Sequence, residues 1–98
     1  MKEIKDSKLD SYFKIVDEAL SVLEISAPKG SHLRVSAEDF MKMIKAYRAD
    51  AEHFKEKGDY VNSFAALSYL YGWIDAGVRL GILSGDKAEK RNRLFTID

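Results

Sequence analysis

The sequence predicts an all-α protein, a three-helix up-down-up antiparallel bundle with an irregular C-terminal tail. Apolar residues recur at intervals of three and four along three long segments, which is the period of helices that face a core. Glycine, proline and capping side chains interrupt that pattern between the segments. A chain of 98 residues is large enough to bury one such core. We therefore expect a single helical-bundle domain over residues 1–98.

The first helix is expected over residues 7–26. Its apolar stripe consists of Leu9, Phe13, Val16, Leu20 and Leu23. Charged side chains occupy the other side, as expected for a helix with one face in water. Pro28 and Gly30 follow and prevent the helix from continuing.

The second helix is expected over residues 33–57, with either Ser31 or Ser36 as its N-terminal cap. Its stripe has the regular four-three spacing of a bundle seam: Leu33, Ala37, Phe40, Ile44, Tyr47, Ala51 and Phe54. Gly58 ends this helix and Asp59 is placed to cap the next one. So short a connection predicts an antiparallel helical hairpin.

The third helix is expected over residues 60–83, and it is apolar on two sides. One face carries Tyr60, Phe64, Leu67, Tyr71, Ile74, Val78 and Ile82, and the other carries Ala66, Tyr69, Leu70, Trp73, Ala76 and Leu80. Two apolar faces require two packing partners. The tail, residues 84–98, is polar until the apolar residues 94–97, which are able to fold back onto the bundle as an extended segment.

Three helices offer too few partners to cover the third helix completely. We therefore expect a non-catalytic interaction module that forms a homo-oligomer, a dimer, through Tyr69, Trp73 and Leu80. The glycines at positions 72, 77 and 81 each cost about 1 kcal/mol relative to alanine within a helix. That cost predicts close approach by neighbouring backbones on both sides of the helix.

Asp75 and Arg79 have the i, i+4 order that favours a helical ion pair. Because Asp75 falls within an apolar face, its carboxylate needs a partner. One interpretation is a structural pair, with a tyrosine hydroxyl such as that of Tyr12 or Tyr47 as a further donor. The other is a polar spot in a ligand cleft.

The ligand interpretation involves the loop before the second helix. Ser31 and His32 lie where free backbone amides at a helix N-terminus can bind an anion. Together with the Asp75 and Arg79 pair, they form a candidate site for a small anionic or nucleotide-like ligand. A weaker alternative is RNA binding through the basic residues of the tail: Lys87, Lys90, Arg91 and Arg93.

Composition argues against several other classes of protein. The chain has no cysteine and equal numbers of acidic and basic residues, so we expect no thiolate metal site and no nucleic-acid partner attracted by net charge. No nucleophile and base can be assembled from the sequence, so we expect no enzyme and no cofactor. Each charge within the third helix would cost about 2.5–3.5 kcal/mol at the centre of a bilayer. We therefore expect a cytoplasmic protein without a membrane partner.

The chain has no glutamine and only two asparagines, while 33% of its residues are charged. Few thermolabile and many ion-pairing side chains are typical of proteins from hot environments.

Residues 72–81 read Gly-Trp-Ile-Asp-Ala-Gly-Val-Arg-Leu-Gly. With residues 28–33, 37–40 and 94–97, this run resembles an archaeal family known as domain of unknown function 357. The resemblance covers about residues 9–98. It implies an archaeal cytosolic helical bundle without an assigned activity, and it carries over no catalytic residues.

Overall fold

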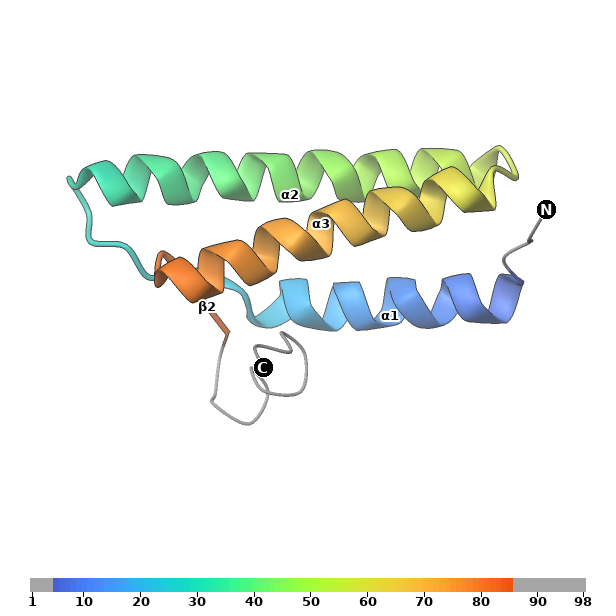
Figure 1. The fold of residues 1–98 in the computed structure, drawn as a ribbon, viewed down its shortest axis with the longest axis horizontal. Helices are drawn as coiled ribbons and strands as arrows, with labels where there is room; N and C mark the ends of the chain where they lie inside the picture. Colours follow the sequence, from blue (N-terminus) through green and yellow to red (C-terminus); the bar gives the residue numbers. More distant parts are fainter. Residues whose placement is uncertain (1–4, 86–98) are drawn as a thin grey trace.

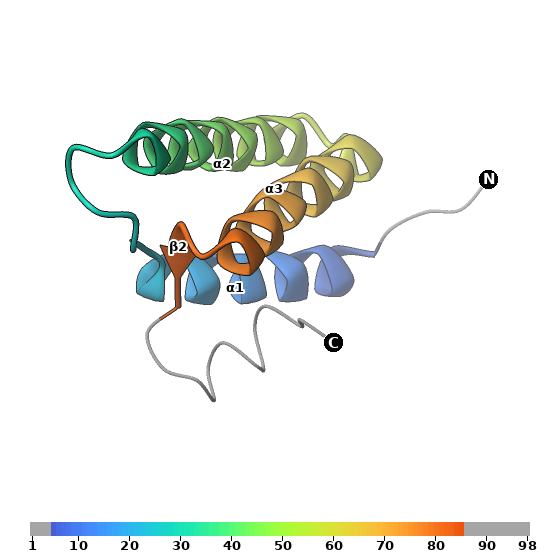
Figure 2. The same ribbon diagram turned by 60° about the vertical axis from the view of Figure 1, so that its left-hand side comes forward.

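The computed structural model describes residues 5–85 (Figure 1). The elements are α1 (Asp6–Val22), β1 (Glu24–Ile25), α2 (His32–Glu56), α3 (Tyr60–Leu80) and β2 (Leu83–Ser84). α2 and α3 form an antiparallel hairpin, and α1 lies along α3 (Figures 1 and 2). The predicted all-α three-helix bundle is confirmed. The expectations for the tail beyond residue 85 fall outside the described residues.

The α2–α3 hairpin forms because the three residues between the helices suit a tight turn. Gly58 has a left-handed φ of +80°, which a residue with a side chain rarely adopts. Asp59 then caps α3, because its side chain accepts a hydrogen bond from the Asn62 backbone amide at 3.2 Å. At the other end, Ser31 rather than Ser36 caps α2 by accepting from the Arg34 amide at 3.1 Å.

A two-stranded sheet shortens the first and third helices relative to the sequence prediction. α1 ends at Val22 rather than residue 26, because Glu24 and Ile25 pair antiparallel with Ser84 and Leu83. α3 ends at Leu80 rather than residue 83, and the following glycine has a φ of +82° that terminates the helix. The pairing joins the end of α1 to the end of α3.

The core lies between the three helices and includes Leu83 of the small sheet. The largest side chains with almost no exposed surface are those of Leu9, Ile44, Leu67, Leu70, Ile74, Ile82 and Leu83. Six of these seven lie on apolar helix faces predicted from the sequence, and Leu83 is the exception. Burying each large aliphatic side chain contributes about 1.5–3 kcal/mol, so this shared core holds α1 to the hairpin.

Ion pairs between α1 and α2 border the core. The Arg48 guanidinium donates to both carboxylate oxygens of Asp17, at 2.8 and 3.1 Å, and to Glu52 at 2.7 Å. Lys55 donates to Asp10 at 2.9 Å. The carbon at the centre of the Arg48 guanidinium lies 4.6 Å from the Phe13 ring centroid. The hydrogen bonds that Arg48 donates to Asp17 raise the pKa of the Arg48 guanidinium.

Candidate interaction surface on the α2–α3 hairpin

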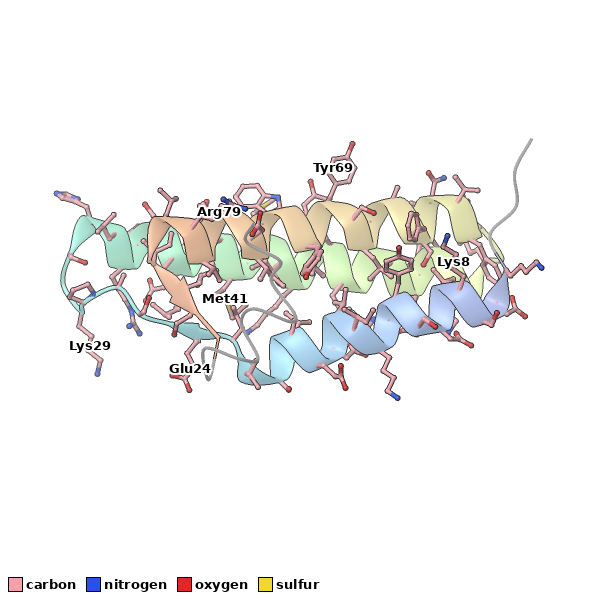
Figure 3. The ribbon with its side chains drawn as sticks, turned by 60° about the horizontal axis from the view of Figure 1, so that its bottom comes forward. Lys8, Glu24, Lys29, Met41, Tyr69 and Arg79 are labelled. Atoms are coloured by element: carbon pink, nitrogen blue, oxygen red, sulfur yellow. The ribbon has the colours of Figure 1, made fainter. Side chains whose placement is uncertain are left out.

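The two apolar sides of α3 have different surroundings. On the first predicted face, Leu67, Ile74 and Val78 are buried by α1 and α2. On the second face, Tyr69 is 64% exposed and Leu80 is 67% exposed, while Trp73 is half-buried. Figure 3 shows Tyr69 projecting from α3 on the side away from α1. α1 therefore leaves part of this second face uncovered.

An open groove of about 400 Å³ lies on this uncovered side of the hairpin. It is lined by Phe40 of α2 and by Ser68, Tyr69, Gly72, Trp73 and Ala76 of α3. None of these side chains is charged. The groove is therefore suited to apolar and aromatic contacts rather than to a small anion.

Aromatic contacts across the hairpin hold the groove in shape. The Phe40 and Trp73 rings pack edge to face, with centroids 4.8 Å apart and an interplanar angle of 88°. Tyr47 and Tyr69 stack with centroids 5.7 Å apart. Both arrangements are favourable for aromatic pairs. They fix the directions of Trp73 and Tyr69, two of the three residues predicted for an interface.

The third predicted interface residue, Leu80, extends the apolar surface toward one end of the hairpin. Leu33 lies seven residues before Phe40 on α2, and Leu80 lies seven residues after Trp73 on α3. Because the two helices are antiparallel, both steps lead about 10 Å toward the same end of the hairpin. The side chains of Leu33 and Leu80 are 55% and 67% exposed. Leu33 thus lies on the surface, although its place in the α2 stripe predicted a core position. We call these residues on one side of the hairpin the apolar strip: Leu33, Phe40, Tyr69, Gly72, Trp73, Ala76 and Leu80.

The glycines of α3 have separate explanations. Gly77 lies against Leu83, and a Cβ atom there would be 2.8 Å from Leu83 Cγ. Gly81 provides the left-handed end of the helix. At Gly72, within the described part of the chain, a Cβ atom would meet no other atom within 4 Å. The close backbone contact expected at Gly72 is therefore absent there, and its cost of about 1 kcal/mol in helix propensity has no internal compensation.

The predicted ion pair between Asp75 and Arg79 is present, with Arg79 Nε donating to Asp75 Oδ2 at 3.1 Å. The Asp75 side chain is about one-third exposed, so it is less buried than its position in an apolar face predicted. Its other oxygen, Oδ1, is buried without a hydrogen-bond partner. Neither Tyr12 nor Tyr47 donates to this oxygen; the Tyr12 ring packs edge-on against Phe64, and the Tyr47 ring stacks on Tyr69.

The polar residues of the alternative ligand site lie on separate elements. The Ser31 hydroxyl caps α2 and also donates to the Pro28 carbonyl at 2.6 Å. His32 is exposed at the first position of α2. No hydrogen bond joins either residue to Asp75. The hydrogen bonds of Ser31 and Asp75 are thus local ones, within the α2 start and within α3.

Two further kinds of feature are absent from residues 5–85. No helix in this range combines the length and the apolarity that crossing a membrane requires. This range also contains no group of three or more histidine, aspartate and glutamate side chains placed to hold a metal ion.

The sequence did not indicate three residues of the surface, Leu33, Phe40 and Gly72. Phe40 belongs to the predicted core stripe of α2, yet it is half-buried and forms a wall of the groove. Tyr47 lies seven residues after Phe40, so both residues are on the same side of α2, next to the uncovered side of α3. That interval is the signal that could have assigned both residues to a second seam.

Comparison with known proteins gives a family but no characterised relative. A search of curated proteins found no match, and a search of solved structures found none. Residues 11–83 match a family described as protein of unknown function (DUF357). This range includes the whole α2–α3 hairpin and most of α1. The chain therefore belongs to the DUF357 family of proteins of unknown function.

Proposed function

We propose that this protein is a non-catalytic interaction module that forms homodimers through the apolar strip. The observation that carries the proposal is the exposure of Tyr69, Leu80 and Leu33 on one side of the hairpin, beside an uncharged groove. Contiguous apolar surface of this kind marks interaction sites in folded proteins. Aromatic residues such as Tyr69 and Trp73 are also enriched where proteins bind one another.

A second copy of the chain is the occupant that fits the size of the strip. The strip extends over about 12 residues of α3, from Tyr69 to Leu80, or about 17 Å, and over the width of two packed helices, about 20 Å. Two such surfaces bury roughly 700 Å² in total, which is below the range of permanent complexes. The dimer should therefore be weak and reversible, with a Kd in the micromolar range or above.

The alternative of a small anionic or nucleotide-like ligand has less support. Its positive group, Arg79, is already next to the Asp75 carboxylate, and a nearby negative charge opposes anion binding. The uncharged groove contains none of the four residues of that candidate site. The tail residues of the RNA alternative lie outside the described range.

We also propose where this protein acts and what kind of organism it comes from. Composition and family resemblance support a cytoplasmic protein from a heat-adapted archaeon. The equal numbers of acidic and basic side chains support a partner recognised by apolar contact rather than by net charge.

Light scattering on paired variants tests the function. The double variant Tyr69→Ser, Leu80→Ser removes two exposed apolar side chains from the strip. Val35→Ser removes one of matching exposure, 66%, from another side of α2, because Val35 is two residues and about 200° from Leu33. We expect the strip variant to remain monomeric at concentrations where the wild type and the Val35 variant form dimers.

A wild type that is strictly monomeric at high concentration would refute self-association. Native mass spectrometry of the freshly purified protein addresses the alternative directly, because a retained small anionic molecule would favour ligand binding instead.

A further inference from the structure

We infer that two copies meet along α3 in antiparallel orientation, with Tyr69 of each copy seated over Gly72 of the other. This inference rests on the proposed function, because it specifies the geometry of the same homodimer. It follows from the order of residues along the outer side of α3, from the space above Gly72 and from the charges near the two ends of the helix.

The outer side of α3 carries a complete helix-pairing seam. Its members are Asn62, Ala65, Tyr69, Gly72, Ala76 and Arg79, at successive intervals of three, four, three, four and three. This is the repeat by which one helix packs along another with a slight left-handed twist. Within the described residues, every member is exposed except Ala65, which is half-buried. The seam is thus available for a helix from a second copy.

Antiparallel pairing matches large residues with small ones along this seam. If Tyr69 of one copy faces Gly72 of the other, two-fold symmetry makes the reciprocal contact at the same time. Ala65 then faces Ala76. The Tyr69 ring enters the open space above Gly72, where an added Cβ atom would lie in its path. A partner's side chain here gives the glycine a role that the described monomer lacks.

Antiparallel pairing also matches the polar ends of the seam. The same register brings Arg79 of one copy to Asn62 of the other. The Asn62 side-chain amide donates to the Asp59 carboxylate at 2.7 Å, so Arg79 meets an amide oxygen and a nearby negative charge. Parallel pairing would instead place Arg79 against Arg79 and Tyr69 against Tyr69. Charge and shape therefore both favour the antiparallel arrangement.

Cysteine pairing tests the register, because the chain contains no natural cysteine. Ala65→Cys and Ala76→Cys each place one thiol on the seam with little change in volume. In the antiparallel register, position 65 of one copy faces position 76 of the other. Identical positions are then 11 residues apart along the helix axis, about 16 Å, which exceeds the reach of a disulfide.

The two variants are oxidised mildly, separately and as an equal mixture, with one of them labelled with ¹⁵N. Val35→Cys gives the background from random collision. We expect the mixture to form disulfide-linked heterodimers several-fold above that background, while each variant alone stays at the background.

Cross-linking of either variant alone as strongly as the mixture would indicate parallel pairing and overturn the inference. The inference is also overturned if the mixture fails to cross-link while light scattering still shows dimers. In that case the proposed homodimer would stand with a different geometry. Absence of any dimer would refute the proposed function and this geometry together.

Discussion

Leu83 closes directly over Gly77, so that a Cβ atom on the glycine would lie 2.8 Å from Leu83 Cγ. Leu83 is only 1% exposed and belongs to β2, which pairs with β1. The glycine thus allows the strand to pack against α3, and the strand in turn holds the end of α1. Because position 77 has no side chain, the small sheet is able to pack against the core.

Replacing Gly77 with alanine should lower the free energy of unfolding by up to about 2 kcal/mol. Overpacking against a fixed leucine costs about 1–3 kcal/mol, and better helix propensity offsets about 1 kcal/mol of that cost. Gly72→Ala is the matched control in the same helix and should gain about 1 kcal/mol in dilute, monomeric protein. Urea denaturation measures both, and changes of the same sign at the two glycines would contradict this assignment.

Ser63 is fully buried, and its hydroxyl donates to the Ala51 carbonyl at 2.7 Å across the hairpin. Ser68, in the same helix, is exposed and donates to the Phe64 carbonyl within its own helix. Ser63→Ala should therefore destabilise by about 1 kcal/mol more than Ser68→Ala, because helix propensity changes equally in both. Equal thermal denaturation of the two variants would show that the hydrogen bond across the hairpin contributes nothing.

Asp59 caps α3 at the hairpin turn. Asp59→Ala should cost about 1 kcal/mol of stability, since the Asn62 amide loses its acceptor. Asp59→Asn keeps a capping oxygen and should remain within a few tenths of a kcal/mol of the wild type. Chemical denaturation compares the three proteins, and an alanine variant as stable as the asparagine variant would rule out capping at this position.

Stability should fall in strongly alkaline solution. The hydrogen bond that Lys55 donates to Asp10 raises the pKa of Lys55 above its ordinary value of 10.5. A hydrogen bond with Asp6 raises the pKa of Tyr60 above 10.0. In both cases the folded state holds the proton more tightly. The stabilisation is therefore present below about pH 10 and is lost as pH rises through the raised pKa values.

Thermal denaturation between about pH 8 and pH 12 checks this dependence. Asp10→Asn removes the main cause of the Lys55 shift, so its melting temperature should fall less steeply with pH than that of the wild type. Parallel curves for the two proteins would show that the Asp10–Lys55 contact does not contribute.

Local chemistry in the sequence was enough to predict the hairpin. Gly58 and Asp59 carry their own turn and cap signals, and the four-three stripe of α2 identifies its buried side. The end of α1 could not be predicted in this way. Glu24 leaves the helix because it pairs with Ser84, which is 60 residues further along the chain. That competition between helix and strand depends on tertiary contacts.

The candidate surface was predictable in part. Helical periodicity indicated that α3 has a second apolar side containing Tyr69, Trp73 and Leu80. Periodicity does not say which side α1 covers, so it could not separate buried Leu70 from exposed Tyr69. Periodicity also could not separate Gly72 from Gly77. The sequence does not show that Gly77 has a close neighbour within the chain and that Gly72 has none there.

Sedimentation equilibrium of the unmodified protein tests the central claim most directly, over a range from about 10 µM to about 1 mM that suits a weak interface. The chain has a mass of 11.1 kDa. We predict that the average mass rises with concentration from this value toward twice this value and goes no higher. An average mass that stays at 11.1 kDa up to the highest concentration would contradict the proposed homodimer.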